Sequence, residues 1–109
     1  MYFDDILISM ERIFEYTKGF DFAGFKSDYK TVDAMIRNFE IIGEAVKNIP
    51  DNIKEQYSEV PWYEMYSLRN RISHAYFGID YEIIWDIITN YLSENKLQIE
   101  KIIFEYEKL

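Results

Sequence analysis

The chain has 109 residues, a formal net charge of −8 and no cysteine. This length suits a single domain with its own core, and the lack of thiols excludes disulfides, thiolate metal sites and cysteine nucleophiles. The negative net charge argues against a general nucleic-acid binder, because affinity for phosphate comes from clustered Lys and Arg.

Aromatic residues make up 18 % of the chain. They provide more apolar surface than a small monomer readily buries, which favours a subunit interface. No segment approaches the ~18 uninterrupted apolar residues of a membrane span, and the acidic start at 1–5 is unlike a signal peptide. We therefore expect one domain over residues 1–109, in a soluble cytoplasmic protein with no membrane contact.

Apolar residues recur at helical spacing along almost the whole chain, and the alternation typical of strands is rare. The expected elements are a helix over 2–17, a loop or short helical turn over 20–29, a helix over 28–49, a short helical piece over 51–57, a helix from 61 to before 78, a helix over 81–92, and a last helical stretch to 106. Short connections between long amphipathic helices predict an all-α, antiparallel up-and-down bundle of four to five helices.

Local signals set several of these boundaries. Gly19 is expected to stop the first helix, and Ser27 or Asp28 to cap the second long one. Pro61 suits the first turn of the next long helix, and Asp80 is a candidate N-cap.

The apolar positions of each helix define the side expected to face the core. In the first half of the chain they are Ile6, Met10, Ile13, Phe14, Val32, Met35, Ile36, Phe39, Ile42, Val46 and Ile49. In the last two stretches they are Ile83, Ile84, Ile87, Ile88, Tyr91, Leu97, Ile99, Ile102, Ile103 and Tyr106, with a kink near Ser93. Gly43 inside the second long helix costs about 1 kcal/mol relative to Ala, and close approach of another helix is the expected reason.

The candidate site lies in the third long helix, where Arg69 precedes His74 by five positions and Tyr76 follows by two. His74 is the only histidine, and the ordinary pKa of histidine lies close to neutral pH, which suits proton transfer. Arg69 offers a positive fork that matches phosphate oxygens. Together they could break a phosphodiester without a metal. The alternative is a surface histidine beside a salt-bridged arginine.

Helix geometry places these residues on different faces. On an ideal helix Arg69 falls on the apolar side, near Met65 and Tyr76. Asn70 and His74 are four apart on the polar face and can touch. Arg69 and His74 are about 140° apart, so they converge on one ligand if the helix distorts or if two copies of it face each other. A buried ion pair or a snorkelling side chain is the structural alternative for Arg69.

A dimer would also supply the second proton-transfer group that RNA cleavage needs. Cleavage of RNA through its own 2′-hydroxyl needs one group to take a proton and another to protonate the leaving oxygen. The chain has one His and no second residue with a naturally suitable pKa. A twofold dimer would bring two copies of His74 and Arg69 to a shared cleft, with one histidine as base, the other as acid, and the arginines stabilising the phosphorane.

The spacing Arg69-x4-His74-x-Tyr76 resembles the motif of HEPN-superfamily ribonucleases, specifically the HepT-like toxins. The similarity extends to the flanks, which are the second-helix signature at 36–45 (IRNFEIIGEA), the pairs at 61–62 and 77–78, and the helix over 81–92 with Trp85.

The resemblance implies an all-α HEPN bundle that forms a homodimer and acts on RNA as a metal-independent endoribonuclease toxin. It implies that Arg69 and His74 are catalytic and that Asn70 supports the site. It also implies a partner, a minimal nucleotidyltransferase that serves as antitoxin and in some members transfers AMP onto the motif tyrosine, here Tyr76. Bulk and negative charge on Tyr76 would compete with substrate phosphate for Arg69.

Other interpretations stay open. The chain could be a non-catalytic helical subunit that binds a nucleotidyltransferase, which the acidic net charge favours. Glu40 and Glu44 are four apart, as in carboxylate metal sites, but no Glu-x-x-His accompanies them, so we expect no metal and no cofactor. Trp62 and Trp85 are expected to be core or interface anchors, and Tyr76 has a structural alternative as a packed helix-edge tyrosine.

Overall fold

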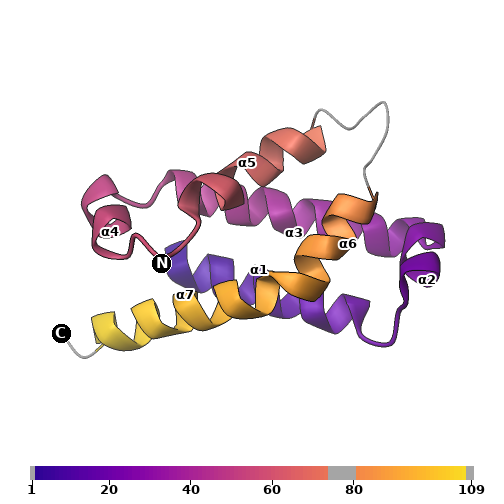
Figure 1. The fold of residues 1–109 in the computed structure, drawn as a ribbon, viewed down its shortest axis with the longest axis horizontal. Helices are drawn as coiled ribbons and strands as arrows, with labels where there is room; N and C mark the ends of the chain where they lie inside the picture. Colours follow the sequence, from indigo (N-terminus) through magenta and orange to yellow (C-terminus); the bar gives the residue numbers. More distant parts are fainter. Residues whose placement is uncertain (1, 74–80, 108–109) are drawn as a thin grey trace.

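The computed structural model describes the backbone of residues 2–73 and 81–107, and the side chains of 2–68 and 81–106. These residues form seven helices and no strand (Figure 1). The helices are α1 (Tyr2–Thr17), α2 (Phe22–Ser27), α3 (Tyr29–Lys47), α4 (Asp51–Gln56), α5 (Trp62–Ser73), α6 (Tyr81–Asn90) and α7 (Leu92–Glu107). The predicted all-α class is confirmed. The long helices are those of the expected bundle, and α2 and α4 are short corner helices.

The long helices pack in an antiparallel order. α1 packs along α3, and α3 packs against α5. α7 contacts α1 and α6, while α6 also touches the short α2. In Figure 1, α1, α3 and α5 run in alternating directions, and α6 and α7 run back toward the end where α1 begins. This is the up-and-down arrangement that short connections between amphipathic helices favour.

Helix ends coincide with local chemical signals. Gly19, just beyond α1, has a φ of +85°, a left-handed conformation that suits glycine. Asp21 caps α2, where its Oδ1 accepts a hydrogen bond from the amide of Gly24 at 2.8 Å. Asp28 caps α3 in the same way, with the amide of Thr31 at 3.4 Å. Of the two caps predicted for this helix, Asp28 is therefore the one the chain uses.

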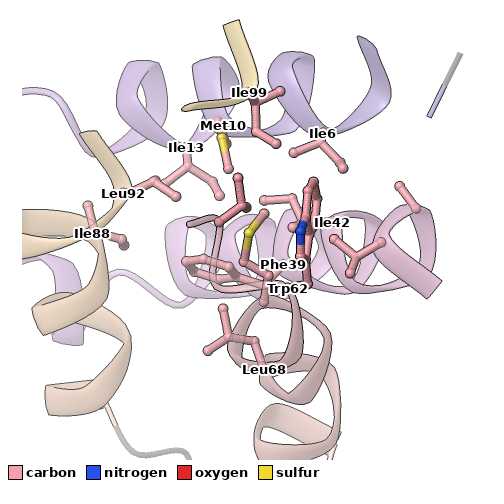
Figure 2. Packing of buried hydrophobic residues seen from close by; sticks show 14 of the residues in the cluster. Ile6, Met10, Ile13, Phe39, Ile42, Trp62, Leu68, Ile88, Leu92 and Ile99 are labelled. Carbon is pink, nitrogen blue, oxygen red and sulfur yellow. The ribbon is translucent and has the colours of Figure 1, made fainter. Parts of the chain in front are cut away.

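The core lies between the long helices (Figure 2). The inward positions predicted for the first half of the chain are confirmed, since nearly all are buried and the exceptions, Phe14 and Ile36, are half-buried against the core. Gly43 is buried as well. Buried apolar surface of this kind supplies the main driving force for folding.

Three inward predictions in the last two helices are wrong. Ile83, Tyr91 and Leu97 are 41 %, 55 % and 67 % exposed. The kink expected near Ser93 is present at Tyr91, where α6 ends at Asn90 and α7 begins at Leu92. Since the two helices have different axes, one continuous stripe cannot describe both. Their buried apolar residues are Ile84, Ile88, Leu92, Ile99 and Ile102.

Tyr106 lies at the edge of the core rather than inside it. It is 37 % exposed, and its ring stacks on that of Phe3 at a centroid distance of 6.0 Å. Within the described ranges, no helix is long and apolar enough to cross a membrane.

Candidate functional site

Helix α5 is the element that carries the candidate motif. It begins at Trp62, directly after Pro61, as the fixed φ of proline favours. Its inward side packs toward α3 through Met65 and Leu68, which are buried. Figure 2 shows Leu68 and Trp62 pointing from this helix into the core. The part of the helix whose side chains are described, up to Leu68, is therefore held by apolar packing.

The first turn of α5 is also fixed by hydrogen bonds. Trp62 Nε1 donates to the carbonyl oxygens of Tyr57 at 3.0 Å and Lys54 at 3.2 Å. The Trp62 ring contacts Phe3 of α1 at a centroid distance of 6.5 Å. These contacts tie the start of the motif helix to the α4 corner and to α1. Trp62 is thus the core anchor that the sequence predicts.

The outward side of α5 agrees with the helix geometry derived from the sequence. Tyr63 is 76 % exposed, and Ser67 is partly exposed. Met65, which helix geometry places on the apolar side, is buried, and so is Leu68 one turn further along. The division of this helix into a core side and a polar side is therefore confirmed for the part of it whose side chains are described.

The four predicted site residues fall at and beyond the end of this described part. Arg69 and Asn70 belong to α5, but their side chains lie outside the described residues, as do His74 and Tyr76 entirely. The structure therefore neither brings these side chains together nor separates them. Their convergence on one substrate stays a prediction.

The helix that follows the motif is anchored to a different part of the bundle. Trp85 of α6 packs against Phe25 of α2 at a centroid distance of 5.0 Å and against Phe22 at 6.4 Å. Lys26 Nζ lies 5.9 Å from the ring centroid of Tyr81, the first residue of α6. Both helices that flank residues 74–80 are thus fixed, α5 on α3 and α6 on α2. Trp85 is the packing anchor that the sequence predicts.

Charge around the start of α5 is unfavourable for phosphate. A hollow of about 620 Å³ lies at the corner between α4 and α5. Its charged lining residues are Asp51, Lys54, Glu55, Glu59 and Glu64. Four carboxylates against one ammonium repel an anionic backbone. The basic residues that the sequence of this helix carries, Arg69 and Arg71, come near its other end.

A second hollow lies between α5 and α6, and sequence reasoning missed it. It has a volume of about 550 Å³, and its lining includes Ile83 and Tyr91, which the periodicity assigned to the core. No sequence signal reveals it, because its walls come from helices whose relative placement is a tertiary property.

Metal-binding groups do not gather in the described residues. No set of three or more His, Asp or Glu side chains is close enough there to hold a metal ion. Glu40 and Glu44, the carboxylates singled out from the sequence, therefore have no third ligand among the described side chains.

The fold and the position of the motif define an all-α bundle whose single histidine follows its third long helix. The profile of the ribonuclease HepT-like family matches residues 6–102. The chain belongs to this family, and the resemblance drawn from the motif and its flanks is confirmed.

Several relatives match the chain over nearly its whole length. A protein of Methanocaldococcus jannaschii assigned as a candidate RNase is 47 % identical over 94 % of this chain and 85 % of its own. A protein of Thermococcus cleftensis named as the probable ribonuclease HepT is 42 % identical over 93 % and 92 %. A candidate RNase of Caldanaerobacter subterraneus is 40 % identical over 94 % and 91 %. No solved structure shows a significant match.

Proposed function

We propose that this protein is a metal-independent endoribonuclease and acts as the toxin of a toxin–antitoxin pair in the cytoplasm. The observation that carries the proposal is the match to the ribonuclease HepT-like family over residues 6–102, with Arg69, His74 and Tyr76 all present at the motif positions. The names of the relatives, which refer to ribonucleases, support the same activity.

The proposed reaction uses the 2′-hydroxyl of the substrate as nucleophile. One His74 takes the proton of this hydroxyl, whose oxygen attacks the adjacent phosphorus. The His74 of a second copy gives a proton to the 5′-oxygen as the P–O bond breaks. Arg69 stabilises the charge of the phosphorane, and Asn70 orients the histidine or the phosphate. The products are a 2′,3′-cyclic phosphate and a 5′-hydroxyl.

A homodimer follows from this division of roles, because one chain supplies one histidine. The two copies of α5 face each other across the cleft in the proposal, which also lets Arg69 of each copy act beside the other's His74. The apolar anchoring of α5 and α6 supports it, since a rigid platform on either side of the motif limits the reorganisation needed at the site.

Control of the toxin is proposed to come from a minimal nucleotidyltransferase that acts as antitoxin. This partner transfers AMP from ATP to the Tyr76 hydroxyl with release of pyrophosphate, which adds a negative phosphate near Arg69. The modified site then resists RNA, because its arginine is already neutralised.

The test is RNA cleavage by the purified protein in EDTA, compared with His74→Ala. The wild type is expected to cleave and leave 2′,3′-cyclic phosphate ends, while His74→Ala is inactive. Activity that disappears in EDTA, or products with linear 5′-phosphate ends, would contradict the proposed mechanism.

A second function is favoured by the net charge of −8 and by the acid-lined hollow at the start of α5. In it the chain is a non-catalytic subunit that binds and assists a nucleotidyltransferase. Absence of cleavage by the wild type, together with a stable complex with that enzyme, would favour this alternative.

A further inference from the structure

The hollow between α5 and α6 is lined largely by apolar side chains. Met65 and Leu68, from the inward side of α5, form one wall. Ile83 and Ile87 of α6, with Tyr91 directly after that helix, form the other. Ile83 and Tyr91 are 41 % and 55 % exposed, so large apolar side chains stand in contact with solvent at its edge. Apolar surface concentrated in a hollow is typical of a binding site.

The spacing of the lining residues indicates which kind of secondary structure would fit the hollow. The lining positions are 61, 64, 65 and 68, at the start of α5 and directly before it, and 83, 86 and 87 on α6, followed by Tyr91 directly after α6 and Asn95 on α7. Each set follows the three-and-four spacing that lines one face of a helix. Two such faces side by side form a groove, and a groove between helices is the surface that an amphipathic helix fills with its apolar stripe.

The charge of the groove restricts the chemistry of that helix. Among the described residues that line it, the charged ones are Glu64 and Asp86, and both are acidic. Within the described part of the chain, no Lys or Arg forms an ion pair with either carboxylate. The Oδ1 of Asp86 accepts a hydrogen bond from Asn90 Nδ2 at 2.5 Å, which satisfies part of the hydrogen-bonding capacity of this carboxylate. Lys or Arg flanking an apolar stripe would complement this rim.

The same charge disfavours other occupants. RNA and anionic lipid carry phosphates that the two carboxylates repel. A second copy of this chain brings its own net charge of −8, and it would place acidic surface against an acidic rim.

We propose that the groove between α5 and α6 is a docking site for an amphipathic helix of a partner protein, with an apolar stripe flanked by Lys or Arg. The inference goes beyond RNA cleavage and holds whether or not the chain is a ribonuclease. Leu68 lines the groove and is followed by Arg69 in the same helix, so the bound helix lies against the element that carries the candidate motif.

The test uses two fluorescent synthetic peptides of about 18 residues, long enough to form a helix. Both have the same leucine stripe, which is flanked by Arg in one and by Glu in the other. Fluorescence anisotropy at physiological salt is expected to show that the full chain binds the Arg peptide at least about tenfold more tightly than the Glu peptide. Failure to bind the Arg peptide, or equal binding of both, would overturn the proposal.

Variants locate the binding surface. Tyr91→Ala is expected to weaken binding of the Arg peptide by about tenfold, and Asp86→Asn by about threefold. The matched controls are Leu97→Ala, which removes an even more exposed apolar side chain outside the groove, and Glu11→Gln on α1, and both should leave affinity unchanged.

Thermal unfolding checks that each variant is folded. Equal weakening by groove and control variants would mean that the peptide binds by general charge, and would overturn the site. Self-association of the free chain that is lost in Tyr91→Ala would place a second copy in the groove, and would overturn the proposed partner.

Discussion

Tyr57 and Glu105 join the α4 corner to the last helix. The hydroxyl of Tyr57 donates a hydrogen bond to Oε2 of Glu105 at 2.5 Å, across 48 positions of sequence. The Tyr57 ring also contacts that of Tyr106 at a centroid distance of 6.4 Å. Trp62 Nε1, which anchors the motif helix, donates a hydrogen bond to the carbonyl oxygen of Tyr57. Tyr57 therefore takes part both in the contact with Glu105 and in the anchoring of the motif helix.

Tyr57→Phe should therefore destabilise the fold. Loss of a hydrogen bond to a carboxylate costs about 1.5–3 kcal/mol of unfolding free energy. Urea unfolding followed by circular dichroism measures the change. Tyr63→Phe is the matched control, because Tyr63 is 76 % exposed on α5, and its stability should equal that of the wild type. Equal stability of Tyr57→Phe would mean that the bond contributes nothing in solution.

The same bond predicts a pH dependence. The hydrogen bond to Glu105 and, as a smaller cause, burial of the hydroxyl together raise the pKa of Tyr57 to about 12. In the unfolded chain the pKa is about 10. Tyr57 therefore stabilises the fold fully below pH ~10, and this contribution is lost as the pH rises toward 12. The stability difference between wild type and Tyr57→Phe should shrink over this range, and a growing difference would contradict the assignment.

Gly19 offers a test of backbone conformation alone. Its φ is +85°, and a Cβ built on it meets nothing within 4 Å. Gly19→Ala should thus lose stability through backbone strain without steric conflict, by about 1 kcal/mol. Gly19→Asn should lose less, because Asn tolerates the left-handed region better. Thermal unfolding of both variants measures this order, and a reversed order would show that the turn changes conformation.

Local signals explain why so much of the fold could be predicted. Asp28 and Pro61 mark helix starts through chemistry that acts within a few residues, so the sequence is sufficient to place them. The stripe on α3 is correct for a similar reason, since this helix is long and packs against both α1 and α5. Periodicity works where one straight helix faces one core.

The wrong predictions of buried positions occur where tertiary structure determines which residues are covered. Ile83 and Tyr91 are apolar and correctly spaced, but they line a groove rather than the core. The pattern shows that a face is apolar and does not show what covers it.

The candidate site has a comparable limit. Residue types and spacing point to Arg69 and His74, whereas their geometry depends on side chains outside the described residues and, in the proposal, on a second copy.

Arg69→Lys tests whether the site needs the planar guanidinium group of arginine or only its positive charge. Lysine keeps the positive charge but cannot make two parallel hydrogen bonds to a phosphate. If Arg69 stabilises the phosphorane, kcat for RNA cleavage should fall about a hundredfold, with a smaller change in KM. Arg12→Lys on the exposed side of α1 is the control and should be fully active. An unchanged kcat in Arg69→Lys would mean that a positive charge at this position suffices and that two parallel hydrogen bonds to the phosphate are not needed.

Tyr76→Phe separates catalysis from control. The phenyl ring keeps the packing of the tyrosine but lacks the hydroxyl that would receive AMP. In the proposal this variant cleaves RNA at about the wild-type rate and is no longer silenced by the nucleotidyltransferase with ATP. Intact-mass measurement should show the added nucleotide on the wild type and on Tyr63→Phe, but not on Tyr76→Phe. If the nucleotidyltransferase still silences Tyr76→Phe without modifying it, control acts through binding instead, and the negative charge beside Arg69 is not the switch.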